Sequence, residues 1–315
     1  MRIKNAFKVL VSNFKLIYKA SLVRIFFSAL AILVAYLAIS DHLMPIITHE
    51  ATQNLIKTIG NLFTNFMNFI TGGEMDTLSI KNAYQGFMDM LSGQHLQIFI
   101  ASSEVFCIAF FLRVIYNMFE YAYAKVLNGF MSARSRFGFL SMLFSDFGRA
   151  LAYSLLYVFI SFMVEMAIII IAIAILIGCL EYIYGFAIFL AIIFLVVALT
   201  FKRAVLSSFL PNIVVENMGV LKALAHTSPK TRKHFASLFG SYFFLNVVTY
   251  YVNVTFAIFT FLTGLAITLP VCSLYFTTVS IVDKYCCKGM RFYTEENQIC
   301  SNHVADKGDS FINKM

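Results

Sequence analysis

The sequence predicts an all-α, polytopic membrane protein with six transmembrane helices, and three observations lead to this fold class. First, 60% of the residues are hydrophobic and 13% are charged, whereas soluble domains have roughly 45–50% and about 25%. Second, six segments are apolar over the ~20 residues that a spanning helix needs. Third, all of the 24 lysine and arginine residues except Lys57 and Lys81 fall on one side of a six-pass arrangement. Positive charge marks the cytoplasmic side, so we expect a multi-pass protein of the cell (plasma) membrane with cytoplasmic N- and C-termini.

The predicted spans follow from the apolar runs. The third run is apolar without interruption over 166–177, so that helix faces lipid or is fully buried. The segments 181–185 and 260–264 are too short for anything but tight turns, which makes the third and fourth helices one hairpin and the fifth and sixth another. The six predicted spans are 22–40, 98–119, 151–179, 184–201, 237–258 and 262–283.

The predicted outer loop, 42–97, carries two stripes of apolar residues at steps of three and four, separated by Gly72 and Gly73. Such stripes are typical of amphipathic helices. We expect these helices to lie in the outer interface or to cap the bundle. A lid over a ligand is the alternative.

Amphipathic segments also precede the outward passes on the predicted inner side. The order of inner helix, outward pass and inward pass then recurs, which suggests a threefold hairpin repeat. We place the membrane domain at 1–285 and expect 286–315 to be a disordered cytoplasmic tail. The inner segments are 1–24, 120–149 and 205–235. The first segment takes its apolar face from Phe7, Leu10, Val11 and Phe14.

The net charge of +8 raises nucleic acid as a partner, but the basic residues sit beside apolar runs, where they face an anionic leaflet. We therefore expect membrane lipids with anionic headgroups as partners, with a protein partner on the cytoplasmic face as the alternative, and no nucleic acid. The candidate residues for this face are Arg113, Lys202, Arg203, Lys230, Arg232 and Lys233.

Ionisable residues inside spanning helices cost roughly 2.5–3.5 kcal/mol to insert and are functional candidates by default. Glu165 lies about halfway along the third predicted helix, so it must face the bundle interior, be protonated or form a pair. The functional interpretation is a proton or cation site, and the structural one is a hydrogen bond that joins helices. Arg113, near the inner end of the second helix, is expected to reach the interface. The candidate intramembrane polar site is Glu104, Glu165, Asn246 and Asn253.

Motifs of catalysis and metal binding are missing from the sequence. It contains neither a zinc-protease helix motif nor a glycine-rich phosphate loop. Its six cysteines show no paired framework, and its six histidines show no ligand spacing. We therefore expect no catalytic residues, no cofactor and no metal site.

The segment 211–228, PNIVVENMGVLKALAHTS, precedes a basic stretch and an apolar run. It contains a proline, an acidic residue, a glycine, an Ala-Leu pair and a serine in that order, at Pro211, Glu216, Gly219, Ala223, Leu224 and Ser228. On these residues the chain resembles the membrane domain fused to some bacterial glycerophosphoryl diester phosphodiesterases, and the stand-alone six-helix bacterial proteins related to it. The resemblance covers about thirty residues. It implies a bacterial six-helix membrane fold, and no phosphodiesterase domain follows that would imply that activity.

Three functional classes remain open. The first is a non-enzymatic integral membrane protein whose basic cytoplasmic face binds anionic lipid or a protein partner. The second is a transporter or permease component with a polar site around Glu165 and Glu104, which predicts a water-accessible pocket at mid-membrane depth. The third is an intramembrane enzyme, for which the sequence displays no converging acid, base and nucleophile.

Overall fold

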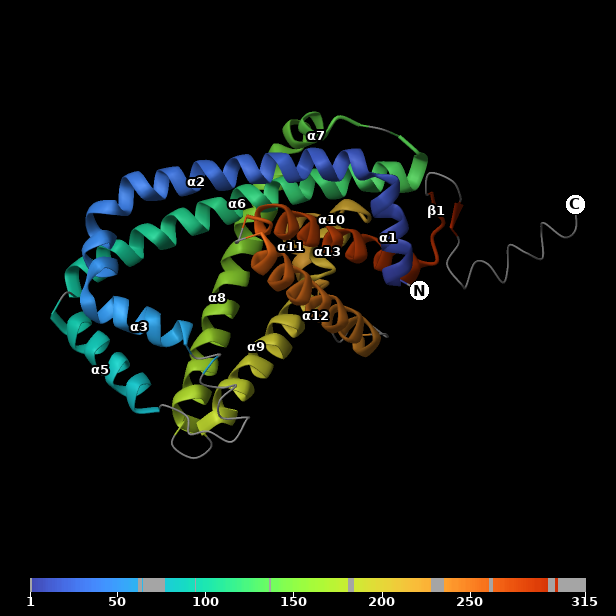
Figure 1. The fold of residues 1–315 in the computed structure, drawn as a ribbon. Coiled ribbons are helices and arrows are strands. Elements are labelled where there is room, and N and C mark those ends of the chain that lie inside the picture. The colour runs from blue at the N-terminus through green and yellow to red at the C-terminus, as the bar shows by residue number, and fades with distance from the viewer. Residues whose placement is uncertain are drawn as a thin grey trace, which may run out of the picture. The chain divides into compact units, whose positions relative to one another are not determined.

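The architecture is that of a computed structural model, which describes residues 2–61, 64, 77–93, 95–135, 137–180, 184–227, 235–260, 263–293 and 298–299. Nearly all of these residues are helical (Figure 1). The long helices are α2 (Phe14–Thr48), α6 (His95–Ala133), α8 (Phe147–Leu180), α9 (Tyr184–Leu206), α12 (Phe235–Phe259) and α13 (Leu265–Lys288). The shorter ones are α1 (Arg2–Ser12), α3 (Glu50–Gly60), α5 (Thr77–Gly93), α7 (Phe139–Ser145), α10 (Phe209–Val214) and α11 (Val220–Ala225).

Among the described residues, six helical stretches are long and apolar enough to cross a membrane. Each overlaps one predicted span, which confirms the all-α polytopic membrane fold. The stretches are Phe14–Leu37, Phe99–Ala133, Phe147–Cys179, Phe186–Val214, Phe235–Phe259 and Leu265–Lys288.

The second spanning helix is longer than predicted. Instead of ending near residue 119, α6 continues through the first part of the predicted inner segment as far as Ala133. Leu127 and Met131 are fully buried on one side of this extension, so packing against the core favours a continuous helix. The helix ends at Arg134, whose φ of 52° is left-handed and incompatible with a further helical turn.

The chain divides into two compact units. The first comprises Met1–Phe27, Arg113–Ile169 and Phe194–Met315, and the second comprises Ser28–Leu112 and Ile170–Ile193. The first unit holds the main hydrophobic core. Within that core, the hydroxyls of Tyr123 in α6 and Thr278 in α13 share a hydrogen bond of 2.7 Å, which satisfies both groups in a buried position.

Helix α1 packs against α13 in the first unit. Ala6 and Val9 are fully buried, and the hydroxyl of Tyr275 in α13 donates a hydrogen bond of 3.1 Å to the α1 backbone. Phe7 and Val11, which belong to the predicted apolar face, are 56% and 54% exposed. The small side chain of Ala6 allows close approach of the two helices, so α1 buries its alanine side and leaves these larger residues outside.

In the second unit, α3 packs against α5. A small apolar cluster there is formed by Ile46, Met90 and Ala101. Helices therefore occupy the second predicted stripe and the part of the first as far as Gly60, while residues 62–63 and 65–76 lie outside the described part. The first spanning helix also continues beyond residue 40, its predicted end, since α2 ends at Thr48.

Helix α13 ends at Gly289, whose φ of 65° is left-handed, a conformation that glycine adopts without a steric cost. A short antiparallel pair of strands follows, β1 (Phe292–Tyr293) and β2 (Gln298–Ile299). These strands lie within the predicted tail, of which residues 300–315 are outside the described part.

Candidate functional site

Glu165 of α8 joins two basic residues from neighbouring helices of the first unit. Its carboxylate pairs with Arg113 of α6 and with Lys202 of α9. Ser161, one turn earlier, donates a hydrogen bond to the same carboxylate (3.3 Å) and accepts one from Nζ of Lys202 (2.8 Å). The Lys202 side chain is 11% exposed and that of Arg113 is 43% exposed. The deep acidic residue of the third span is thus held between two cations.

Arg203, the next residue on α9, has different partners. Its Nη1 donates a hydrogen bond of 2.6 Å to Oδ1 of Asn246, and Nδ2 of Asn246 donates one of 2.7 Å to Thr200. The guanidinium carbon lies 3.9 Å from the centroid of the Phe276 ring, a cation–π geometry. In the described part of the chain, no carboxylate lies within ion-pair distance of Arg203. Asn246 therefore orients Arg203 and does not contact Glu165.

A polar cavity of about 120 Å³ lies beside Arg203. Its lining comes from α6, α8, α9, α10, α12 and α13. The polar lining residues are Asn117, Glu120, Tyr153, Tyr157, Arg203, Ser207, Tyr242, Ser273, Thr277 and Ser280, and the apolar ones are Leu206, Leu210 and Phe276.

These lining residues lie near the predicted inner ends of five spans. Glu120 directly follows the second predicted span, and Arg203 lies two residues beyond the fourth. Tyr153 and Tyr242 lie near the start of the third and fifth, and Ser280 near the end of the sixth. The cavity is therefore on the side where basic residues gather, rather than around Glu165 and Glu104.

Glu120 supplies the acidic wall of the cavity and is already paired. Its carboxylate accepts a hydrogen bond from the Thr277 hydroxyl and lies 3.6 Å from the guanidinium of Arg24 in α2. Arg24 is 4% exposed, so this is a buried pair. The charges of Arg24 and Glu120 offset each other, which leaves the positive charge of Arg203 uncompensated by any described carboxylate.

Glu216 attaches the segment 211–228, here called the family-like segment, to the end of α13. Burial raises the pKa of Glu216, but hydrogen bonds and charge from Lys284 and Lys288 outweigh burial, so the pKa lies below its ordinary value. Lys284 also donates a hydrogen bond of 2.6 Å to Asn212 in α10. The Asn212 amide in turn donates one of 3.2 Å to the carbonyl of Ala223 in α11. The segment thus contains two short helices, and hydrogen bonds and ion pairs attach it to α13. Both α10 and α13 contribute residues to the cavity lining.

Asp146, between α7 and α8, ties the start of α8 to α6. Its carboxylate accepts hydrogen bonds from Lys125 and from the Tyr121 hydroxyl (3.0 Å). The hydrogen bond from Lys125 holds the pKa of Asp146 below its ordinary value, against the opposing effect of burial. These contacts fix the start of α8, the helix that contributes Tyr153 and Tyr157 to the cavity lining.

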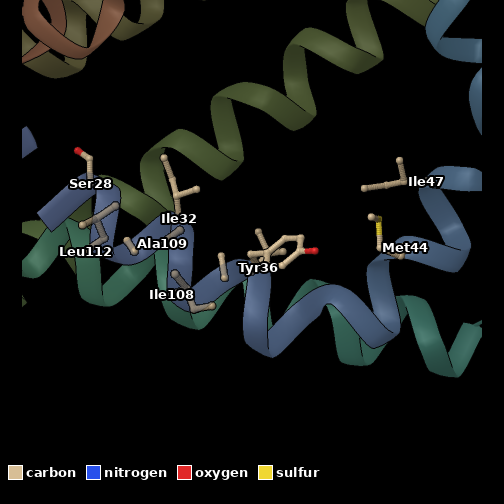
Figure 2. A pocket seen from close by; sticks show the side chains of 11 residues that line it. Ser28, Ile32, Tyr36, Met44, Ile47, Ile108, Ala109 and Leu112 are labelled. Atoms are coloured by element: carbon tan, nitrogen blue, oxygen red, sulfur yellow. The ribbon is translucent and has the colours of Figure 1, made fainter. Parts of the chain in front are cut away.

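A second cavity, of about 570 Å³, lies between α2 and α6 in the second unit (Figure 2). Figure 2 shows Ile32 and Tyr36 of α2 along its wall with Ile108 and Ala109 of α6. The lining is almost wholly apolar. A surface of this kind suits contact with acyl chains and offers few polar groups for a charged solute.

The predicted basic face divides into two groups. Arg113 and Lys202 are engaged with Glu165, and Arg203 lines the cavity, so these three contact polar partners inside the first unit. The remaining predicted cations, Lys230, Arg232 and Lys233, lie outside the described residues, as does Ser228 of the family-like segment.

The predicted intramembrane polar site is also divided. Glu165 and Asn246 belong to the first unit but to different clusters. Asn253 is 9% exposed, and its Oδ1 has no hydrogen-bond partner in the part of the chain that the structure describes. Glu104 is half-buried on α6 in the second unit.

Sequence reasoning missed several residues of the cavity, notably Glu120, Tyr153, Tyr157 and Thr277. Glu120 was assigned to an inner segment because the predicted span ended one residue before it. The continuation of α6 beyond Glu120 shows in the burial of its residues as far as Leu127, which the sequence alone does not display. The tyrosines carry no signal either, because aromatic residues at helical spacing are equally typical of a core.

Comparisons with known proteins add no relative. No family model, no curated protein and no solved structure matches the chain. Its function is therefore inferred from the geometry and charge of the site.

Proposed function

We propose that this integral membrane protein holds a small polar solute in the cavity beside Arg203, as a transporter or permease component. The observation that carries this proposal is the lining itself, which combines the carboxylate of a buried ion pair, a further cation and a series of hydroxyls within one helix bundle. Ionisable residues at such positions are costly unless they are paired or line a water-filled or ligand-filled space. We propose further that the protein catalyses no reaction.

The distribution of the basic residues supports this function over a purely surface-directed role. Lys202 and Arg203 are consecutive on α9, yet one contacts Glu165 and the other contacts Asn246 and the cavity. Had they served only to meet lipid headgroups, an exposed position at the end of the helix would be sufficient. Both residues instead contact polar side chains inside the first unit, as ionisable residues do when they line a polar space between helices.

Solvent access to the cavity tests the proposal, with Ser280→Cys as the probe and Ser154→Cys as the matched control. Both serines are buried, at 8% and 0% exposed, and each donates a hydrogen bond of 2.7 Å to its own helix backbone. Only Ser280 lines the cavity. We expect methyl methanethiosulfonate, a small neutral reagent, to label Ser280→Cys much faster than Ser154→Cys, as read by peptide mass spectrometry of membranes. Equally slow labelling at both positions would refute a solvated cavity.

A second candidate function, binding of anionic lipid at the inner face, is favoured by α1 and the start of α2. Lys4, Lys8 and Lys15 are exposed there. They alternate with Phe7 and Phe14, which are 56% and 64% exposed. Exposed aromatic residues interleaved with lysines are typical of a helix that lies in the headgroup region. The cations at 230–233 belong to the same proposal.

This second candidate is tested by native mass spectrometry of the purified protein with phosphatidylglycerol. Each lysine near an anionic surface contributes ~1 kcal/mol, so the triple variant Lys4→Gln, Lys8→Gln, Lys15→Gln is expected to lose most of its lipid adducts. The control carries Lys57→Gln and Lys81→Gln, which remove the two lysines of the predicted outer side. Equal adduct loss in both variants would contradict an inner lipid-binding face.

We also propose membership of the bacterial six-helix membrane-domain family on the strength of the segment that begins at Pro211. Among the motif residues that the structure describes, Gly219 precedes α11 directly and Ala223 is fully buried. Glu216 makes ion pairs with α13. Relatives of the family are expected to carry a basic residue opposite this acidic position, which an alignment of family sequences would test.

A further inference from the structure

We infer that Arg203 is the anion-binding residue of the cavity and that its ligand class is a short monocarboxylate. This inference rests on the proposed function, because it names the solute that the cavity holds. Three properties of the cavity lead to it: the free donors of Arg203, the local charge balance, and the size and character of the walls.

The guanidinium of Arg203 is fixed in place but retains unused donors. One of its five N–H groups donates to Asn246, and its face rests on Phe276. Within the described residues the other donors have no hydrogen-bond partner. A planar fork of parallel N–H groups matches a carboxylate in bidentate geometry. Asn246 and Phe276 thus hold Arg203 in one orientation before any ligand arrives, which reduces the entropic cost of binding.

The charge balance favours a single negative charge. Arg24 and Glu120 offset each other across 3.6 Å, so among the described residues that line the cavity Arg203 carries the one charge that no carboxylate offsets. A monocarboxylate neutralises that charge. A phosphate dianion would leave an excess negative charge next to the carboxylate of Glu120, which like-charge repulsion disfavours.

The walls limit the size of the ligand and accommodate a short carbon chain. A volume of about 120 Å³ favours a small ligand and leaves room for a few carbon atoms beyond the carboxylate. Leu206 and Leu210 offer an apolar surface for such a chain. Tyr153 and Tyr157 also line the cavity, and a phenol hydroxyl can bond a polar substituent.

Protection of Ser280→Cys from methyl methanethiosulfonate tests the inference with three probes. Propionate carries the proposed group, propionamide is its neutral isostere, and inorganic phosphate is the competing anion. We expect propionate to slow the labelling and propionamide to have little effect. Adding Arg203→Lys keeps the positive charge but removes the bidentate fork, so propionate should then be needed at about tenfold higher concentration or more. The control Lys222→Gln removes an exposed cation of α11 and should leave protection unchanged.

The outcomes separate this inference from the proposed function. Labelling that propionamide slows as well as propionate, or protection that survives Arg203→Lys unchanged, overturns the anion-binding role while the solvated cavity stands. Stronger protection by phosphate overturns the monocarboxylate class. An absence of labelling at Ser280→Cys overturns the proposed function and the inference together. The Arg203→Lys variant is accepted as folded only if its labelling rate without ligand equals that of its parent.

Discussion

Replacing Glu165 by glutamine is expected to destabilise the first unit by about 3 kcal/mol. The substitution preserves the shape of the side chain and removes its charge, so that Arg113 and Lys202 lose their shared anion. Lys202 is the costly partner, since its side chain is only 11% exposed and it keeps only neutral acceptors, the Ser161 hydroxyl and the amide oxygen of the introduced glutamine.

The magnitude follows from the exposure of each partner. Removing one member of a buried ion pair costs about 3–5 kcal/mol. The cost at Lys202 should lie near the lower end of that range because Lys202 keeps its hydrogen bond to Ser161. Arg113 is 43% exposed, and an exposed pair contributes about 1 kcal/mol or less. A compensating change is available, because Lys202→Met removes the stranded cation. The double variant Glu165→Gln, Lys202→Met should therefore be more stable than Glu165→Gln alone.

Unfolding of the purified protein in mixed micelles by increasing sodium dodecyl sulfate measures these differences. A double-mutant cycle should give a coupling energy above about 1.5 kcal/mol for Glu165 with Lys202 and below about 1 kcal/mol for Glu165 with Arg113. The reasoning is refuted if Glu165→Gln costs less than about 1 kcal/mol, or if the two single substitutions simply add.

Two further predictions concern the core and the inner end of the bundle. Tyr123→Phe removes the hydrogen bond between the Tyr123 and Thr278 hydroxyls, while Thr278 keeps its bond to the Leu274 carbonyl, and should cost about 1 kcal/mol in the same unfolding assay; no loss would mean that the hydrogen bond is replaced. The pKa of Glu216 is lowered in the fold. Its pairs with Lys284 and Lys288 therefore stabilise the protein at pH values above 4.5, the ordinary pKa of the carboxyl group. This contribution is lost as the pH falls through the lowered pKa. Thermal unfolding should thus show Glu216→Gln less stable than wild type at pH 7, with a difference that shrinks on acidification, and a constant difference would contradict this assignment.

Much of the fold is predictable from the sequence because a spanning helix is specified locally. Twenty apolar residues in a row have few alternatives in a bilayer, and each of the six predicted spans overlaps a helix. Helix ends are less predictable because they depend on packing. The extension of α6 to Ala133 is favoured by Leu127 and Met131, whose burial depends on helices far along the chain.

The polar site is only partly predictable for the same reason. Glu165 stands out in the sequence because an acid in an apolar run has few explanations. Its partners Arg113 and Lys202 are 52 and 37 residues away, so their pairing depends on how three helices pack. Arg113 was expected at the interface, since nothing near it in sequence reveals an acid on another helix. Arg203 and Lys202 are neighbouring cations in the sequence, and their different partners follow from the different directions in which they leave α9.

The measurement that tests the central claim most directly is the ratio of labelling rates at Ser280→Cys by anionic and cationic methanethiosulfonates of similar size. An accessible cavity whose uncompensated charge is that of Arg203 predicts faster labelling by the anionic sulfonatoethyl reagent than by the cationic trimethylammonioethyl reagent. Adding Arg203→Gln should remove or invert that preference. Faster labelling by the cation with Arg203 intact, or no labelling by either reagent, would contradict the account.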